Sequence, residues 1–409
     1  MTDVRGTWAL AALGLLLTTG CPQPAPLDDA PCTFDGETPA GVALTVSVHY
    51  RGFDTGTDEA YQQVATEVDW VADWAARHDL ALELALNGYQ AEAALAAGET
   101  ARFTALAEAG HGFGVHHHPT VRVDPLVWAD LGAEPTDAEL QQSVDDHRDW
   151  VGQALDPLGI EYPGGHARLT GRGDWWAGMM ADSGYTTETV EQWAWAATGG
   201  ELGADHDVLH PFRWAPCDPC PELVSDPAVP FVAVPQHPQV GKVAGGEHLD
   251  FDGTVPHLRT TLMLAYLEWR AEVLSGDAPR VWATGVTIHP EQGAGQNEDL
   301  DRLGAFLVEN FLDPAEGGIG RSVCPVTREE LRGWHETWED AHPGEAAFEL
   351  RGGDYPYRLP QLREVYGHHL VARHLDEADR GVHIVELQRV EPVDGGFEPQ
   401  ETVLLVWAD

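Results

Sequence analysis

Short apolar segments alternate with longer amphipathic segments from residue 43 to residue 343, and this alternation limits the possible folds more than any other feature of the chain. In the first apolar segment, aliphatic side chains occupy every second position, and Thr45, Ser47 and His49 occupy the positions between them. A period of two is typical of a strand, whose successive side chains point to opposite faces. The next segment, residues 58–77, has valines at the spacing of one helical face. Repeated strand–helix units of this kind predict a parallel sheet.

About seven such units over roughly 300 residues predict an α/β fold, a distorted (β/α)7–8 barrel over residues 41–343. Thr136 and Glu139, and again Thr327 and Glu330, have the spacing of capping boxes, which begin helices. The strands are predicted at residues 43–49, 80–87, 110–119, 160–163, 185–190, 281–289 and 319–323. The helices are predicted at residues 58–77, 100–109, 136–155, 174–183, 258–274, 298–311 and from residue 327 onward.

Two regions depart from the strand–helix alternation. Residues 198–255 are rich in Pro, Gly and His and are predicted to form a long irregular insertion. Residues 344–409 have no long helical pattern but contain strand-like segments at 370–372, 381–390 and 401–407, which predict a small β-rich appendage. The appendage is either a carbohydrate-binding module or a lid that stabilises the barrel.

The beginning of the chain indicates export. Arg5 precedes an apolar run over residues 8–17, and small residues then lead to Gly20 and Cys21. This order is typical of a signal peptide, and Gly20 before Cys21 resembles a bacterial lipoprotein cleavage site, so residues 1–21 are predicted to be the signal segment with its lipidation cysteine. Residues 22–40 are then a Pro-rich tether to the cell envelope, and Cys21 is the point of contact with the membrane.

Four cysteines remain after Cys21, and an even number in an exported chain suggests disulfides. The favoured pairs are Cys32 with Cys324 and Cys217 with Cys220, although three pairings are open. A zinc site at Cys217 and Cys220 is the competing interpretation.

The net charge excludes one class of partner. The chain has a formal net charge of -44, and Lys242 is its one lysine. Binding to nucleic acid depends on neutralising phosphates, so a nucleic-acid partner is not expected. The sequence also has no phosphate-binding glycine loop and no Gly-x-Ser-x-Gly nucleophile motif.

Histidines gather where the predicted strands end. Residues 110–119 form a strand-like stretch that contains three successive histidines, of which His116 and His118 should share one face while His117 points to the other. His49 ends the first strand, and the carboxyl ends of barrel strands form the active-site face of such folds. His49, His116 and His118 therefore predict three nitrogen ligands for a divalent transition metal, with zinc favoured and a fourth position left for water.

One stretch resembles a known family. Residues 110–116 have the pattern Gly-His-x-x-Gly-x-His, the preceding apolar strand ends in Asn87-Gly88, and a late strand ends in Ile288-His289. This order resembles the polysaccharide deacetylase group of distorted (β/α) barrels. The resemblance implies that His116 binds the metal and that His289 is the catalytic acid.

The chain departs from the family pattern at two places. The family has paired aspartates where this chain has Ser47-Val48-His49-Tyr50, and it has a second metal histidine where this chain has Thr120. His49 and His118 would replace the missing ligands. Asp54 and Glu188 are the nearest candidates for the catalytic base.

The function predicted from these features is an exported, lipid-anchored, metal-dependent carbohydrate hydrolase that removes acyl groups from an envelope or extracellular glycan. Two alternatives stay open. The same barrel could be a glycoside hydrolase, which uses two carboxylates on either side of the scissile bond. It could also be a non-catalytic glycan-binding lipoprotein, since the paired aspartates are missing.

Overall fold

The computed structural model describes residues 31–50, 58–132, 134–167, 179, 182–189, 210–213, 223–224, 232–234, 269, 273, 279–288, 296–308, 312, 323–345, 349–350, 369–377, 382–393 and 396–408. Several predicted features lie outside these residues, namely the signal segment with Cys21, most of the helices predicted at 174–183 and 258–274, Asp54, Cys217, Cys220 and His289. Among the described helices, none combines the length and apolar character needed to span a membrane.

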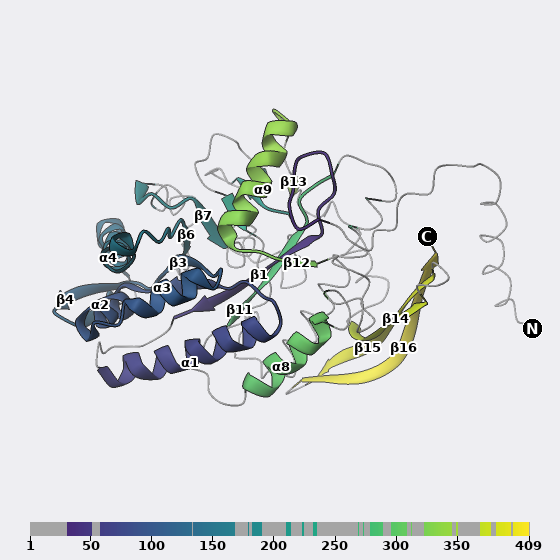
Figure 1. The fold of residues 1–409 in the computed structure, drawn as a ribbon, viewed down its shortest axis with the longest axis horizontal. Coiled ribbons are helices and arrows are strands. Elements are labelled where there is room, and N and C mark those ends of the chain that lie inside the picture. Colours follow the sequence, from purple (N-terminus) through teal and green to yellow (C-terminus); the bar gives the residue numbers. More distant parts are fainter. Residues whose placement is uncertain are drawn as a thin grey trace, which may run out of the picture.

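A mainly parallel sheet is the centre of the fold (Figure 1). Its strand order is β11-β1-β2-β3-β6-β7-β10-β8, all neighbours being parallel except β10 and β8, and β12 also pairs with β1. The strands are β1 Val42–His49, β2 Glu83–Leu86, β3 Gly112–His117, β6 Gly164–Ala167, β7 Thr187–Thr189, β8 Phe212–Arg213, β10 Val232–Val234, β11 Ala283–Ile288 and β12 Val323–Pro325. The edge strands β11 and β8 are not paired with each other in the described part, so the sheet is a curled half-barrel. The predicted α/β fold class is confirmed.

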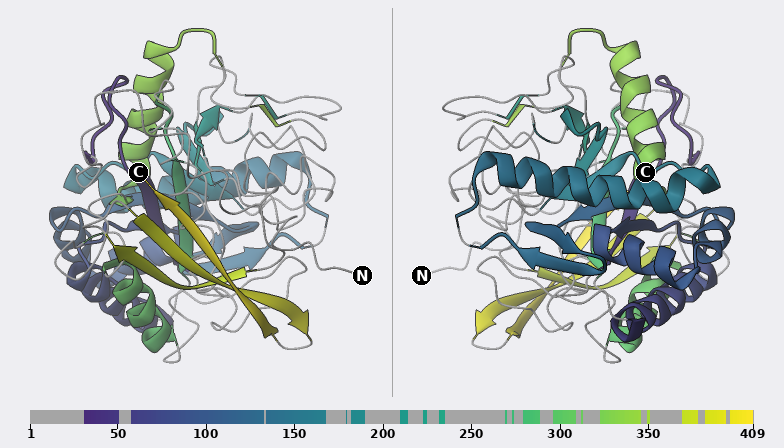
Figure 2. Two further views of the ribbon diagram at one scale, coloured as in Figure 1. Left: turned by 90° about the vertical axis from the view of Figure 1, so that its right-hand side faces the viewer. Right: turned by 90° about the vertical axis from the view of Figure 1, so that its left-hand side faces the viewer.

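Helices pack around this sheet, as the alternation predicts (Figure 1). They are α1 Asp58–Arg77, α2 Gly88–Ala97, α3 Ala101–Glu108, α4 Asp137–Leu155, α8 Gln296–Leu307 and α9 Arg328–Ala341. Both predicted capping boxes are present, at Thr136 for α4 and at Thr327 for α9. The right-hand view of Figure 2 shows α4 along its full length, in front of the sheet.

The two faces of the sheet differ in polarity. All eight residues of β1 are buried, and Leu44, Val46 and Val48 belong to one apolar core together with inward-facing residues of α1 and α4. The other face of β1 carries Thr45, Ser47 and His49, which are also buried. This second face lines the inside of the half-barrel, so the interior is polar.

A buried charged pair occupies that interior. The side chains of Glu83 on β2 and Arg328 at the start of α9 are both fully enclosed. The Arg328 guanidinium donates hydrogen bonds to the Gly165 carbonyl oxygen and to Ser47 Oγ, each at 3.1 Å, and its backbone N–H donates to Glu83 Oε2 at 3.4 Å. Burial raises the pKa of Glu83, and the positive charge of Arg328 opposes that shift.

Glycines on the neighbouring strands make room for this pair. A Cβ atom at Gly112 would lie 2.5 Å from Glu83 Oε2, and one at Gly114 would lie 2.9 Å from Glu83 Oε1. A Cβ atom at Gly164 would lie 2.7 Å from Thr187 Oγ1 and 3.3 Å from Arg328. The glycines of β3 and β6 are therefore required by packing inside the half-barrel.

Three sequence predictions of secondary structure were inaccurate. The strand predicted at residues 160–163 begins at Gly164 instead, because only glycine fits beside Thr187 and Arg328 there. The region 198–255 is not wholly irregular, since β8 and β10 within it extend the main sheet. The sequence prediction also omitted α2 and the hairpin formed by β4 Thr120–Asp124 and β5 Val127–Asp130.

A disulfide and two smaller sheets accompany the main sheet. Cys32 and Cys324 form a disulfide, as predicted, and it links the segment before β1 to β12. The last strands, β14 His369–Glu377, β15 Val382–Val393 and β16 Gly396–Ala408, form a separate antiparallel sheet. A second small sheet pairs β9 Leu223–Val224 with β13 Glu349–Leu350.

Candidate functional site

The three histidines predicted as metal ligands lie together at the carboxyl end of the sheet. The ring centroid of His116 is 4.3 Å from that of His49 and 4.5 Å from that of His118. All three side chains are enclosed, with 1%, 3% and 5% exposure for His49, His116 and His118. The fold thus brings together residues from two strands that β2 separates.

One hydrogen bond orients the ring of His116. Its Nδ1 lies 3.3 Å from the backbone carbonyl oxygen of Tyr50. A carbonyl oxygen only accepts hydrogen bonds, so Nδ1 carries a proton and donates this bond, which leaves Nε2 as the nitrogen that faces away from it. Such a bond from the second ring nitrogen orients histidine ligands in metal sites. The same carbonyl accepts a bond of 2.5 Å from Asn87 Nδ2, and the Asn87 side chain also caps α2.

His117 points to the opposite face, as strand alternation predicts. Its Nε2 lies 2.9 Å from Ser143 Oγ on α4, and its ring lies 5.2 Å from that of His147. Burial lowers the pKa of His117 to about 3, with a smaller contribution from the neighbouring His118. His117 is therefore a neutral residue of the sheet–helix interface and does not belong to the histidine cluster.

Thr120 is at the position where the family pattern has a second metal histidine, and its side chain is hydrogen-bonded to α4. Its Oγ1 lies 2.9 Å from Nε2 of His147, a fully buried residue of α4. The other ring nitrogen of His147 accepts a bond of 2.9 Å from the backbone N–H of Gly88. Burial lowers the pKa of His147 well below its usual value, so this ring is neutral.

The donor set suits a transition metal in its chemistry. Imidazole nitrogens are the kind of ligands that zinc takes. The His116 ring is tilted by 37° against that of His49 and by 56° against that of His118. As they stand, no group of three or more His, Cys, Asp or Glu side chains in the described part of the chain is arranged to hold a metal ion. The donor chemistry of the three histidines therefore suits a transition metal, while their present arrangement does not form a metal-binding group.

The structure describes only one of the three predicted acid and base residues, Glu188, and it describes only the backbone of that residue. Asp54 and His289 lie outside the described residues. Ile288, which precedes His289 in the chain, pairs with Val48, which precedes His49. The backbone of Glu188 is in β7, where it pairs with Gly165.

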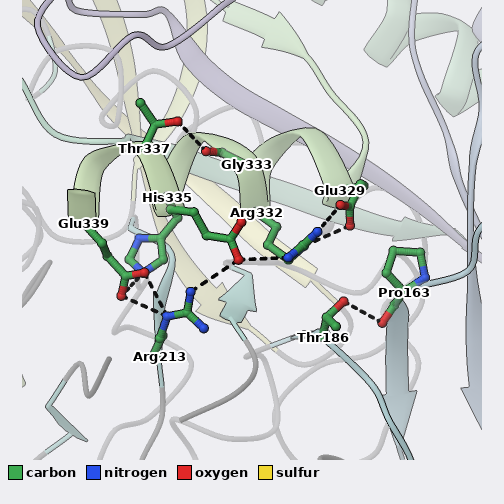
Figure 3. Close-up of polar contacts among 10 residues, drawn as sticks. Pro163, Thr186, Arg213, Glu329, Arg332, Gly333, His335, Thr337 and Glu339 are labelled. Carbon is green, nitrogen blue, oxygen red and sulfur yellow. Dashed lines mark hydrogen bonds and ion pairs between the residues drawn. The ribbon is translucent and has the colours of Figure 1, made fainter. Parts of the chain in front are cut away.

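Arg213, on the edge strand β8, is ion-paired (Figure 3). Its Nε donates to both carboxylate oxygens of Glu339, at 2.8 and 3.0 Å, and its Nη2 lies 3.3 Å from Glu336. Arg332 bonds Glu336 at 2.8 Å, and Glu339 also lies 3.3 Å from His335 Nε2. This network fastens the edge strand β8 to α9.

The residues that sequence reasoning missed are those that support the histidines. Asn87 is noted in the sequence only as the end of a strand, and Ser143 and His147 carry no motif, because the roles of all three depend on contacts between distant segments. Buried polar positions on the apolar stripe of α4 were the one available signal. Glu92 was also missed, although it holds the β4–β5 hairpin through bonds from Arg122 at 2.8 Å and from Trp128 Nε1 at 2.9 Å.

No family model matches the chain, and no curated protein matches it significantly. Solved structures do match. Polysaccharide deacetylases are among them. A Mycobacterium smegmatis protein assigned as a polysaccharide deacetylase is 14% identical with a TM-score of 0.41, and the match covers 74% of this chain and 96% of that chain.

Two other matching structures have different activities in their descriptions. The Puue allantoinase is 14% identical with a TM-score of 0.44, over 74% of this chain and 92% of that chain. A 4-alpha-glucanotransferase from Thermococcus litoralis is 12% identical with a TM-score of 0.42, over 71% of this chain and 40% of that chain. With such low identities and TM-scores, these likenesses are too remote to assign a reaction to this chain.

Proposed function

We propose that this protein is an exported, lipid-anchored, metal-dependent hydrolase that removes acyl groups from an envelope or extracellular glycan. The observation that carries the proposal is the contact among His49, His116 and His118 at the carboxyl end of parallel strands. Active sites of barrel enzymes lie at that end. Enclosed imidazoles gathered at one end of a sheet are suited to be ligands of a shared metal.

His49, His116 and His118 would hold the metal, and zinc suits these nitrogen donors. A zinc ion there would supply a Lewis acid for the acyl carbonyl group. The Tyr50 carbonyl would keep the His116 ring in the tautomer that leaves Nε2 basic. The family resemblance points to the same use of His116.

Hydrolysis of an amide or ester also needs an acid and a base. A carboxylate would take a proton from the attacking water, and His289 would give a proton to the leaving nitrogen or oxygen. The residues that precede His289 and His49 in the chain, Ile288 and Val48, pair in adjacent strands. Asp54 and Glu188 are the two candidates for the base.

Export is supported by the disulfide between Cys32 and Cys324. Disulfides persist in oxidising compartments outside the cytosol. The lipid anchor at Cys21 remains part of the proposal and is testable by mass spectrometry of the membrane-bound protein.

The experiment is a measurement of metal content in the full chain by elemental mass spectrometry. We expect about one metal ion per chain in the wild type and none after the triple change of His49, His116 and His118 to alanine. His342→Ala is the matched control, because His342 is a half-buried histidine at the end of α9, where its Nδ1 lies 2.9 Å from the Trp338 carbonyl oxygen one turn earlier. A wild type without metal would overturn the metal-dependent mechanism.

The reaction is tested by product analysis on acetylated chitin oligomers and on acetylxylan, with and without a chelator. Release of acetate that stops on chelation supports the proposal. Release of reducing ends without acetate would indicate a glycoside hydrolase, and binding without turnover, unchanged by chelation, would indicate a glycan-binding lipoprotein.

A further inference from the structure

Two polar side chains of α4 are fully buried where this helix meets the end of β3. They are Ser143 and His147, and the other inward positions of the helix are mainly apolar. A buried hydroxyl or imidazole loses its hydration, so each needs hydrogen-bond partners that repay the loss. The partners of these two residues lie at the candidate site.

Ser143 holds the backbone that follows His116. Its Oγ lies 2.5 Å from the carbonyl oxygen of Thr120 and 3.1 Å from that of His118, and the hydroxyl proton can bond one of them at a time. Because both carbonyls are acceptors, Oγ in turn accepts the bond of 2.9 Å from Nε2 of His117. One hydroxyl is therefore within hydrogen-bonding distance of three residues of the segment 117–120.

His147 joins the ends of two strands. Its Nδ1 accepts the Gly88 backbone N–H at 2.9 Å, so the proton of the neutral ring is on Nε2, which donates to Thr120 Oγ1 at 2.9 Å. Gly88 directly follows Asn87, whose side chain bonds the Tyr50 carbonyl that also accepts the His116 bond. The chain of bonds thus runs behind the histidine cluster from β3 through α4 to the loops after β1 and β2.

We propose that Ser143 and His147 are positioning residues that hold the segment 117–120 so that His116 and His118 lie together with His49. This inference rests on the proposed function, because the placement of the three rings matters only if the cluster binds a ligand. Neither residue is proposed to contact a ligand itself. Each acts through the backbone or side chains of the segment that carries the ligands.

A matched control separates positioning from simple support of the fold. Val151 is also a fully buried residue on the inward face of α4, and it lies two turns further along the helix from Ser143. Val151→Ala removes core packing but no bond to the segment 117–120. Ser143→Ala removes the hydroxyl but little volume. Both variants are expected to lower the unfolding temperature.

The experiment measures cobalt(II) binding and local amide hydrogen exchange in the full-length wild type, Ser143→Ala, His147→Ala and Val151→Ala. Cobalt(II) is the probe because its absorption spectrum reports ligand geometry. We expect the Ser143 and His147 variants to bind cobalt about 10- to 100-fold more weakly, the usual effect of removing such supporting bonds, and to have an altered spectrum. Their amides at residues 117, 118 and 120 should exchange faster than in Val151→Ala, while Pro119 has no amide proton.

Each outcome decides one question. Unchanged cobalt affinity and unchanged exchange at residues 117–120 in Ser143→Ala and His147→Ala would overturn the positioning role. If the wild type binds neither cobalt nor zinc, the proposed function fails, and the exchange comparison with Val151→Ala still tests the positioning of the segment. An equal loss of cobalt binding in Val151→Ala would also overturn the role, because general destabilisation would then explain the effect.

Discussion

The ring of His49 lies 4.3 Å from the ring of His116, although the two residues are on strands that are not hydrogen-bonded to each other. The strand between them, β2, has Ala85 as the register partner of His49, and Ala85 in turn pairs with Gly114. Ala85 is fully buried and has only a methyl side chain, which leaves room for the two imidazoles to meet across the intervening strand. The histidine cluster therefore depends on a small residue of β2 as well as on the histidines themselves.

Enlarging Ala85 should separate the histidines. Ala85 is fully buried, so Ala85→Leu forces extra methyl groups into a packed site, at a cost of about 1–3 kcal/mol in the free energy of unfolding. We expect this variant to lose its bound metal as well, because the leucine displaces His49 or His116. Ala65→Leu, which overpacks a buried position of α1, serves as the control. Equal metal content in both variants, measured by elemental mass spectrometry, would contradict this account.

The buried pair of Glu83 and Arg328 should behave as a coupled unit. Arg328→Met leaves the carboxyl group of Glu83 buried without the nearby positive charge, and we expect a loss of about 3–5 kcal/mol in unfolding free energy. Combining it with Glu83→Gln should recover part of that loss, because no lone charge then remains inside the half-barrel. Denaturant unfolding of the two single variants and the double variant measures the coupling. Additive effects would show that the two side chains do not interact.

The same pair predicts a pH dependence. Burial raises the pKa of Glu83 in the folded protein above its unfolded value. The unfolded chain therefore loses this proton at a lower pH than the folded chain does, and stability relative to Glu83→Gln falls as pH rises from about 4.5 through the folded pKa. Thermal unfolding of both proteins between pH 4 and pH 8 measures the difference. A difference that stays constant over this range would exclude the shift.

Much of the fold follows from local patterns in the sequence. The alternation in residues 43–49 and the capping boxes at Thr136 and Thr327 each depend on neighbours within one element, and each is present in the structure. The favoured pairing of Cys32 with Cys324 is present too. These features are readable because strand and helix periods are set by backbone geometry.

What the sequence does not show depends on contacts between distant segments. The first seven residues of α2 are all buried, so that helix has no polar face to mark its period. The strand β6 begins with two glycines, which have low strand propensity, and the first of them, Gly164, is required by the closeness of Thr187 and Arg328. The sequence placed His49, His116 and His118 at strand ends, but the supporting bonds from α4 require the tertiary structure.

The disulfide should contribute strongly to stability. It joins residues separated by 292 positions, and a cross-link that closes a long loop removes much of the conformational freedom of the unfolded chain. Changing both Cys32 and Cys324 to serine should cost about 2–5 kcal/mol in unfolding free energy. Thermal unfolding with and without a reductant checks this, and the reductant should have a smaller effect on the double variant than on the wild type. An unfolding temperature unchanged by the substitutions would show that this link adds nothing.

His210 should make the protein less stable in mild acid. The ring is fully buried, and its Nδ1 donates to the Val281 carbonyl oxygen at 2.7 Å. Burial lowers the pKa of His210 well below its unfolded value of about 6.5, the positive charge of Arg280 acts in the same direction, and the hydrogen bond to Val281 opposes this shift only in part. As pH falls below about 6.5, the unfolded chain takes up a proton at this histidine while the folded chain does not, so stability is lost by up to about 1.4 kcal/mol per pH unit.

The substitution His210→Asn isolates this contribution, because an asparagine amide can donate to the same carbonyl but does not titrate. Above about pH 7.5, the difference in unfolding free energy between wild type and variant should be constant, since the histidine is then neutral in both states. Below about pH 6.5, that difference should move steadily in favour of the variant. Denaturant unfolding from pH 5 to pH 8 measures it, and parallel stability curves over the whole range would mean that His210 is protonated equally in the folded and unfolded chains.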